Sequence, residues 1–196
     1  MSHTTHTGEH ETDAASRYPP DDLIRELHHA AATGQISRVA TLLAGGLSIN
    51  APDADGKTPL HHAVIAGREE MVLSLLSRSA QVNCFDRWLR TPLHEAASTG
   101  QVTIAKALLT FGADIAVRER MHQMTALHLA VLNEHAHMVA FLLSWGASPL
   151  ATDIFGVTPF ELARSSNQLI TEQIDHWIHG PSQVDLSTRS CDTENT

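Results

Sequence analysis

The chain has 196 residues and a formal net charge of −9 at pH 7, and 42% of its residues are hydrophobic. This length and composition are typical of one folded domain or a short repeat array, and not of a disordered or fibrous chain. No apolar run approaches the roughly 18 residues that a membrane-spanning helix needs, and no basic stripe could neutralise nucleic-acid phosphates, so we expect neither membrane insertion nor direct nucleic-acid binding.

The first 20 residues are polar and lack the apolar segment of a signal peptide. We therefore expect residues 1–20 to form a disordered, His-rich N-terminal tail on an intracellular protein, in the cytoplasm, the nucleus or both. His3, His6 and His10 offer nitrogens that a transition metal could bind weakly, but their polar setting favours plain disorder.

The segment that follows the tail repeats itself. The hexapeptides RELHHA, TPLHHA, TPLHEA, TALHLA and TPFELA begin at residues 25, 58, 91, 125 and 158. This regular spacing predicts one repeat domain over residues 21–180. Its five repeats are expected at about residues 21–52, 53–85, 86–118, 119–152 and 153–180.

Each hexapeptide predicts the start of a helix. Thr58 can cap a helix, Pro59 suits the first helical position, and Leu60 then faces inward. Gly67 is expected to end this short helix in a left-handed conformation, and a second helix with an apolar pair follows. The repeat-motif residues are Thr58, Pro59, Leu60, His61, Thr91, Pro92, Leu93, His94, Thr125, Leu127, His128, Thr158 and Glu161.

This combination of hexapeptide, glycine and Leu-Leu pair resembles the ankyrin repeat, over about residues 22–178. The resemblance implies an all-α solenoid of stacked helix-turn-helix units with β-hairpin fingers on one side. A stack is also what the physics requires, because one such unit cannot bury its own apolar face. In similar proteins the motif histidine ties neighbouring turns by hydrogen bonds, and we prefer this structural role to metal binding for His61, His94 and His128.

The first repeat departs from this pattern because it lacks Thr-Pro. We expect its first helix to be a solvent-facing cap, since it carries four polar residues, Arg25, Glu26, His28 and His29. The adjacent pairs His28–His29 and His61–His62 predict no metal site, because neighbouring helical positions do not share a face.

Repeats four and five also depart. Repeat four has one extra residue in its turn and Glu134 where a glycine belongs, so the sequence leaves its turn geometry open. Repeat five replaces the histidine with Glu161, which is expected to form a capping box with Thr158. Residues 181–196 are acidic and polar, and we expect a disordered C-terminal tail.

Catalytic motifs are absent from the sequence. It contains no phosphate-binding loop, no dinucleotide fingerprint and no G-x-S-x-G motif. Cys84 has no assigned histidine partner that would lower its pKa, and Cys84 and Cys191 do not imply a disulfide. We therefore predict that the protein is not an enzyme and carries no cofactor.

Asn50 and Asn83 end corresponding inter-repeat segments. In similar proteins such side chains brace the finger turn. Leu42 and Leu75 lie eight residues upstream, which also matches the pattern hydroxylated by an asparaginyl hydroxylase in similar proteins, so Asn50 and Asn83 are possible modification sites.

The finger tips carry aromatic and basic residues where polar solvent-facing residues are usual. Exposed aromatic side chains surrounded by arginine are typical of protein-binding hot spots. The alternative is that Trp88 and Phe155 fold back onto neighbouring fingers, since Leu89 occupies a usual glycine position. The predicted partner-binding residues are Arg87, Trp88, Arg90, Arg118, Arg120, Met121, Ile154 and Phe155 at the fingers, with Ile65, Ser98 and Leu132 at helix ends.

These features predict a non-enzymatic adaptor or scaffold that binds another protein through the concave face and finger tips of the array. The arginines favour a partner with an acidic and apolar segment, and we favour a monomer, although the oligomeric state stays open. One alternative is a regulatory inhibitor subunit of a kinase or transcription-factor complex, because arrays of this size resemble ankyrin-type inhibitors of cyclin-dependent kinases. A weaker alternative is a substrate receptor of a ubiquitin ligase, which the polar segment 182–196 disfavours.

Overall fold

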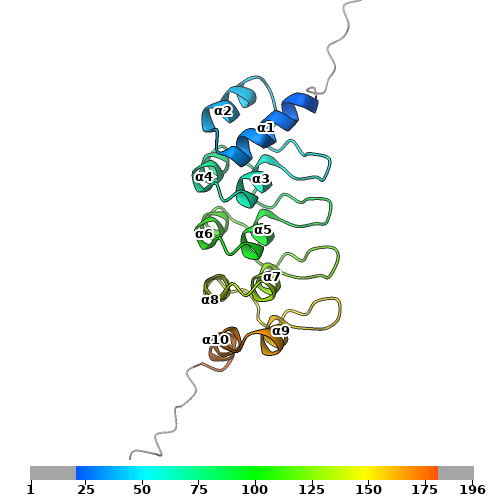
Figure 1. Cartoon of the computed structure of the whole chain (residues 1–196), viewed down its shortest axis with the longest axis vertical. Helices are drawn as coiled ribbons and strands as arrows, with labels where there is room; N and C mark the ends of the chain where they lie inside the picture. Colours follow the sequence, from blue (N-terminus) through cyan, green and yellow to red (C-terminus); the bar gives the residue numbers. More distant parts are fainter. Residues whose placement is uncertain (1–20, 181–196) are drawn as a thin grey trace, which may run out of the picture.

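The computed structural model describes residues 21–180, and both tails, with His3, His6, His10 and Cys191, lie outside this part. Ten α-helices and no strand occur within it. The helices form five pairs stacked in one direction, with finger loops along one side (Figure 1). The expected all-α repeat solenoid is therefore confirmed.

Each repeat contributes a first helix beside the fingers and a second helix on the far side (Figure 1). The first helices are α1 (Asp21–Thr33), α3 (Pro59–Ile65), α5 (Pro92–Ser98), α7 (Ala126–Leu132) and α9 (Pro159–Ser166). The second helices are α2 (Ile36–Ala44), α4 (Glu69–Ser77), α6 (Val102–Thr110), α8 (Ala136–Ser144) and α10 (Gln168–His179).

The helix boundaries follow the sequence signals closely. Thr58 is extended and Pro59 occupies the first turn of α3, where its missing N–H leaves no helical bond unmade. Gly67 follows α3 with a φ of 67°, which glycine adopts without the steric cost of a side chain. In repeat four, Glu134 takes the same left-handed conformation at a φ of 58°. The turn after α7 is therefore regular despite its missing glycine.

One continuous apolar core runs through the stack. First helices pack on first helices of the neighbouring repeats, and second helices pack on second helices from α4 to α10. The leucines Leu27, Leu60, Leu93 and Leu127 occupy the same place in successive repeats and are fully buried. None of the helices between residues 21 and 180 is long and apolar enough to cross a membrane.

The fingers are loops without a β-strand in residues 21–180, so their expected β-hairpin character is not shown. In the first finger, the Asp53 N–H donates to the Lys57 carbonyl at 2.9 Å. The Lys57 N–H donates to Asp53 Oδ1 at 2.8 Å and not to the Asp53 carbonyl. Because the carboxylate takes this N–H, the reciprocal pair of backbone bonds that begins a β-ladder is not formed. Asp86 and Asp153 organise their fingers in the same way.

The extra residue of repeat four is accommodated by a longer side chain. Glu119 stands where the other fingers have aspartate, and its carboxylate accepts from the N–H groups of Met121, His122 and Met124 at 2.6, 2.6 and 3.2 Å. The burial of Glu119 and these three bonds have opposite effects on the pKa of its carboxyl group. Burial alone would raise the pKa of this carboxyl, but the bonds hold the pKa below its usual value.

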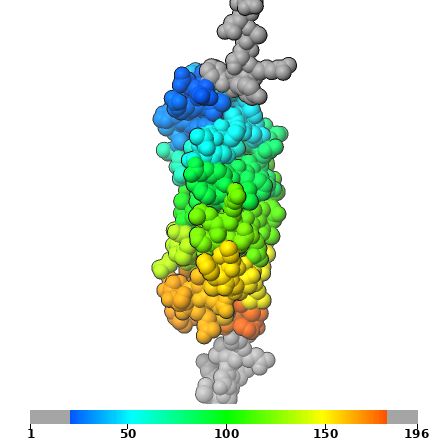
Figure 2. Space-filling model, turned by 90° about the vertical axis from the view of Figure 1, so that its right-hand side faces the viewer, coloured from blue at the N-terminus to red at the C-terminus, as the bar shows by residue number. Residues whose placement is uncertain are grey.

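Neighbouring fingers are joined edge to edge by backbone hydrogen bonds. Arg87 N–H donates to the Asp55 carbonyl at 2.8 Å, Arg120 N–H to the Trp88 carbonyl at 2.8 Å, and Ile154 N–H to the His122 carbonyl at 2.7 Å. We call this series the finger ladder. It fixes the spacing of the finger tips, which Figure 2 views face on as a continuous column.

Candidate functional site

The motif histidines of repeats two to four join each repeat to the next. His61 Nε2 donates to the Arg90 carbonyl at 3.1 Å, so in the neutral ring Nδ1 is the acceptor. Nδ1 accepts from the backbone N–H and the hydroxyl of Thr58 at 3.2 and 3.1 Å. His94 and His128 bond to their own threonines and to the next finger in the same way. Both ring nitrogens are therefore committed, and none of these rings is free to bind a metal.

Burial keeps these rings neutral. Loss of hydration lowers the pKa of His94 to about 4, although its bond to the Met124 carbonyl opposes the shift. Burial likewise lowers the pKa of His61 and His128. Protonation would place a hydrogen on Nδ1 and would remove the acceptor for the threonine groups, so the neutral ring is part of the folded architecture.

Repeat five uses a carboxylate for the same task. Glu161 Oε2 accepts from the Thr158 N–H at 2.8 Å, and the Glu161 N–H donates to the Thr158 hydroxyl at 3.2 Å. This is the reciprocal arrangement of a capping box. The bond from the Thr158 backbone is the main reason that the pKa of Glu161 is lowered.

Cys84 has a histidine neighbour that the sequence did not assign. Its Sγ lies 3.6 Å from His61 Nδ1 and 3.2 Å from the Thr58 hydroxyl. Burial nevertheless raises the pKa of the thiol, and the bond to Thr58 only partly opposes this. Cys84 therefore stays protonated at neutral pH, which is the wrong state for a nucleophile.

The two asparagines brace the end of the next second helix, and not a finger. Asn50 Oδ1 accepts from the Gln81 N–H at 2.9 Å. Asn83 Oδ1 accepts from the Asp114 N–H at 2.8 Å, and its Nδ2 donates to the Gly112 carbonyl at 3.0 Å. The hydroxylation of Asn50 and Asn83 stays a prediction.

Fingers two and three form an apolar hollow of about 530 Å³ with the face of α7. Trp88 and Met121 line it from the fingers, and Leu132 lines it from the end of α7. Met121 and Leu132 are 59% and 56% exposed. Trp88 is half-buried beneath the Arg87 guanidinium, whose centre lies 4.2 Å from the ring centroid. Trp88 therefore packs on its own finger and also presents a face to the hollow.

Four lining residues were not predicted from the sequence. Glu119, His122, Met124 and Leu129 complete the hollow, together with the predicted Arg90. Leu129 directly follows a motif histidine, where repeats two and three carry the polar His62 and Glu95. An apolar residue at this otherwise polar position was the available signal.

The other predicted surface residues lie apart from this hollow. Phe155 and Ile154 are 75% and 58% exposed on the fourth finger, and Phe155 lies next to His122, with ring centroids 6.4 Å apart. Ile65 is exposed at the end of α3, two fingers away, and Ser98 is half-buried at the end of α5. The structure therefore extends the apolar surface toward repeat five more than toward repeat two.

The four arginines differ in how far their charge is compensated. Arg87 pairs with Asp55 at 2.6 Å, and Arg90 lies 3.6 Å from Glu95. Arg118 donates to the Thr152 carbonyl, and Arg120 is exposed. Neither Arg118 nor Arg120 forms an ion pair with another residue of the described segment. Of these four arginines, the two without an ion pair are both on the third finger, which also carries the Glu119 carboxylate.

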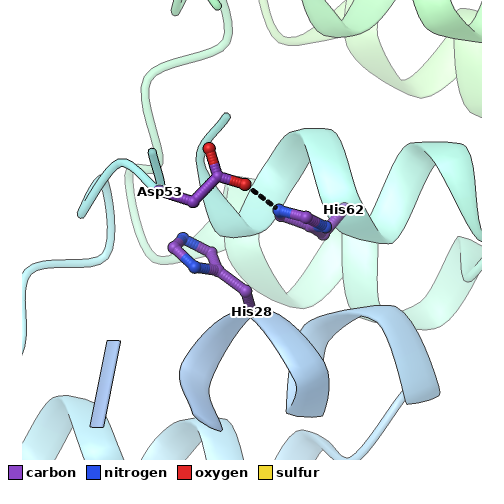
Figure 3. Close-up of side chains that lie close together, drawn as sticks. All are labelled: His28, Asp53 and His62. Carbon is purple, nitrogen blue, oxygen red and sulfur yellow. Dashed lines mark hydrogen bonds and ion pairs between the residues drawn. The ribbon is translucent and has the colours of Figure 1, made fainter. Parts of the chain in front are cut away.

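One group of candidate metal ligands occurs in the described segment, at the junction of the first two repeats. His28, Asp53 and His62 each offer one ligand atom, and these atoms lie within 4.8 Å of one another (Figure 3). His28 is only 5% exposed, which corrects the expected solvent-facing position. The finger between repeats one and two folds over α1 and buries the ring, whose Nε2 donates to the Ala51 carbonyl at 2.8 Å.

Comparison with known families agrees with this architecture. A family model described as ankyrin repeats, in three copies, matches residues 25–86 and again residues 80–153. Together the two matches span well over half of the chain. A search of curated proteins finds no match.

Proposed function

Because the chain belongs to the ankyrin-repeat family, we propose that it is a non-enzymatic adaptor that binds a partner protein through its finger face. We define the finger face as the four finger tips together with the adjoining ends of α3, α5 and α7. Ankyrin arrays are generally protein–protein interaction modules and are typically not enzymes, so the family supports the class of function. The finer claim concerns which surface binds and what it recognises.

The hollow lined by Trp88, Met121 and Leu132 is the observation that carries this proposal. Exposed side chains of this size lose contact with water when a partner covers them, and the gain is roughly 25 cal/mol for each Å² of apolar surface buried. Aromatic and methionine side chains are also enriched at interfaces. The hollow therefore suits one large apolar side chain of the partner, with Phe155 as an adjacent contact.

The charges beside the hollow select for acidic groups. Arg118 and Arg120 are on the third finger, and their charges are not paired within residues 21–180. Arg87 and Arg90 contribute less, because Asp55 and Glu95 already lie against them. We therefore expect the partner segment to place an acidic residue near Arg120, and the association rate to fall as salt screens this attraction.

The finger ladder holds the finger tips in a fixed arrangement before a partner binds. Each finger tip is bonded to its neighbour, so partner binding need not order the loops, and the entropy that loop ordering costs in other interfaces is saved. We therefore expect the finger tips to keep the same backbone conformation in the free and the bound protein.

Paired variants test this proposal. Met121→Ser/Leu132→Ser removes two exposed apolar side chains of the hollow, whereas Leu73→Ser removes a somewhat less exposed leucine from α4 on the far side. Partners would be captured from native-cell lysate, and the affinity of each purified partner would then be measured by calorimetry. We expect at least a tenfold loss for the double variant and less than a twofold change for Leu73→Ser. Equal affinities for the wild type and the double variant would contradict the proposal.

A further inference from the structure

His28, Asp53 and His62 form a cluster that shares no residue with the hollow between the second and third fingers. His28 comes from α1, Asp53 from the first finger and His62 from α3, so the cluster lies where repeat one meets repeat two (Figure 3). We propose that this cluster is a binding site for a divalent transition cation of the Zn²⁺ class. The cation would join the first repeat to the second.

The donor set matches this class of cation. Two imidazoles and one carboxylate are the ligands of many three-residue zinc sites, with a water completing the tetrahedron. Imidazole disfavours Ca²⁺ and Mg²⁺, which take oxygen ligands.

The spacing of the ligand atoms is close to what an ion requires. Ligands bound tetrahedrally at 2.0–2.1 Å stand roughly 3.3–3.4 Å apart. In this structure His62 Nε2 and Asp53 Oδ2 are 2.8 Å apart, joined by a hydrogen bond, and the ring centroids of His28 and His62 are 4.8 Å apart. Small side-chain rotations are enough to receive an ion, which would replace the proton that His62 and Asp53 now share.

Repeat one lacks the Thr-Pro of the motif, and this leaves Nδ1 of His28 without the threonine partner that the other motif histidines have. Arg25 stands where the other repeats have threonine, and α1 begins four residues earlier, at Asp21, so Arg25 lies inside the helix. No threonine hydroxyl or helix-start N–H is therefore available to occupy His28 Nδ1. The bond from Nε2 to Ala51 is kept if the ion is bound through Nδ1 and is given up if Nε2 is the ligand.

An ion and its water can reach the cluster. His62 and Asp53 side chains are about a quarter exposed, and all three residues line a hollow of about 760 Å³ beside α1. Asp21, Arg25, His29 and Asp55 also line this hollow, and Asp55 is paired with Arg87. The site therefore has an entry path, which a wholly buried cluster would lack.

The test is direct metal titration of the full chain. His3, His6 and His10 are first changed together to glutamine (H3Q/H6Q/H10Q), so that the tail cannot bind the metal. This parent would be titrated with Zn²⁺ by calorimetry and with Co²⁺ by visible absorption. We expect one ion per chain and a Co²⁺ spectrum of four- or five-coordinate geometry. Absence of binding, or an octahedral Co²⁺ spectrum, would overturn the proposal without recourse to any variant.

Two ligand variants and one control then locate the site. His28→Gln and His62→Gln in the parent should each weaken Zn²⁺ binding at least tenfold, whereas His137→Gln on the exposed face of α8 should not. Zinc at about 100 times its Kd should raise the Tm of the parent by roughly 5–10 °C, because it binds only the folded chain. Far-UV circular dichroism in chelator checks that each variant is folded. Unchanged binding in both folded ligand variants would overturn the assignment.

Discussion

The first repeat and the inner repeats place the same residue types at corresponding positions but bond them differently. In repeats two to four the motif histidine accepts at Nδ1 and donates at Nε2, whereas His28 makes one bond, to Ala51. Asn83 makes two bonds to the following repeat, whereas Asn50 makes one. The inner repeats thus use their polar side chains to hold neighbours together. Polar side chains of the first repeat make fewer hydrogen bonds to neighbouring residues, so they are available to bind a ligand.

The largest expected effect is on stability when an inner ring is removed. His94→Ala should lower the free energy of unfolding by about 3–5 kcal/mol, because it leaves a cavity and unsatisfied buried groups at Thr91 and Met124. His28→Ala should cost about 2 kcal/mol or less, since its ring borders the hollow beside α1 and makes only one hydrogen bond. Urea unfolding followed by circular dichroism measures both, with exposed His137→Ala as control. If His94→Ala and His28→Ala lowered the free energy of unfolding equally, the proposed difference between the first repeat and the inner repeats would be wrong.

Acidification should act mainly through the inner histidines. The pKa of His94 is about 4 in the folded chain and about 6.5 when unfolded, so the unfolded chain binds more protons between these values. Stability is therefore lost as pH falls, by about 2 kcal/mol from His94 between pH 7 and pH 5. The lowered pKa values of His28, His61 and His128 act in the same direction.

Urea titrations at pH 7 and pH 5 check this expectation. His94→Gln should show a smaller loss than the wild type, because glutamine does not titrate. His137→Gln should retain the whole loss. A wild-type stability that did not change between the two pH values would show that His94 takes up its proton as readily in the folded chain as in the unfolded chain.

The asparagines should show the same contrast on a smaller scale. Asn83→Ala removes the bonds to Asp114 and Gly112 and should cost about 1–2 kcal/mol, whereas Asn50→Ala removes one bond and should cost about 1 kcal/mol. Thermal and urea unfolding of the two variants give the difference. A larger loss of unfolding free energy for Asn50→Ala than for Asn83→Ala would contradict this expectation.

The smallest expected effect on stability comes from substitutions in the fingers. Here the first finger has the favourable residue at the turn, and the second finger has the unfavourable one. Gly56 in the first finger and Leu89 in the second both have positive φ, 77° and 58°. Leucine is strained there, so Leu89→Gly should stabilise the protein by about 0.5–1 kcal/mol after the greater flexibility of glycine is counted. Gly56→Ala should destabilise it, because the new Cβ would lie 3.0 Å from Arg87 N. A destabilising Leu89→Gly would mean that Leu89 packs usefully on its neighbours.

The sequence predicted the positions that recur in every repeat, but it did not predict the hydrogen bonds that individual side chains make in the fingers. Leu60, Leu93 and Leu127 were placed in the core because their spacing shows that they share one environment. The β-hairpin character of the fingers is not shown, because the second hydrogen bond of each finger goes to an aspartate side chain or, in the third finger, to Glu119, a choice that strand propensity does not describe. Glu119 was not recognised as the residue that replaces this aspartate, although the extra residue in its finger was visible.

The candidate sites were harder to predict for a related reason. Met121 and Leu132 were named from their positions, but the hollow also needs Met124 and Leu129, which only the packing of the third finger on α7 brings together. The metal ligands were dismissed because His28–His29 and His61–His62 were weighed as pairs along the chain. Stacking instead brings His28 beside His62, 34 residues later, with Asp53 between them.

The finger ladder also has a mechanical consequence. Its three bonds connect the four fingers, and the helices α1 and α2 precede the first of them. If the two ends of the array were pulled apart, contacts between successive repeats would carry the same force in series, because each repeat touches only its neighbours. The first rupture would then occur at the weakest joint between repeats. At the joints that the finger ladder crosses, its backbone bonds would have to break in addition to the helix packing.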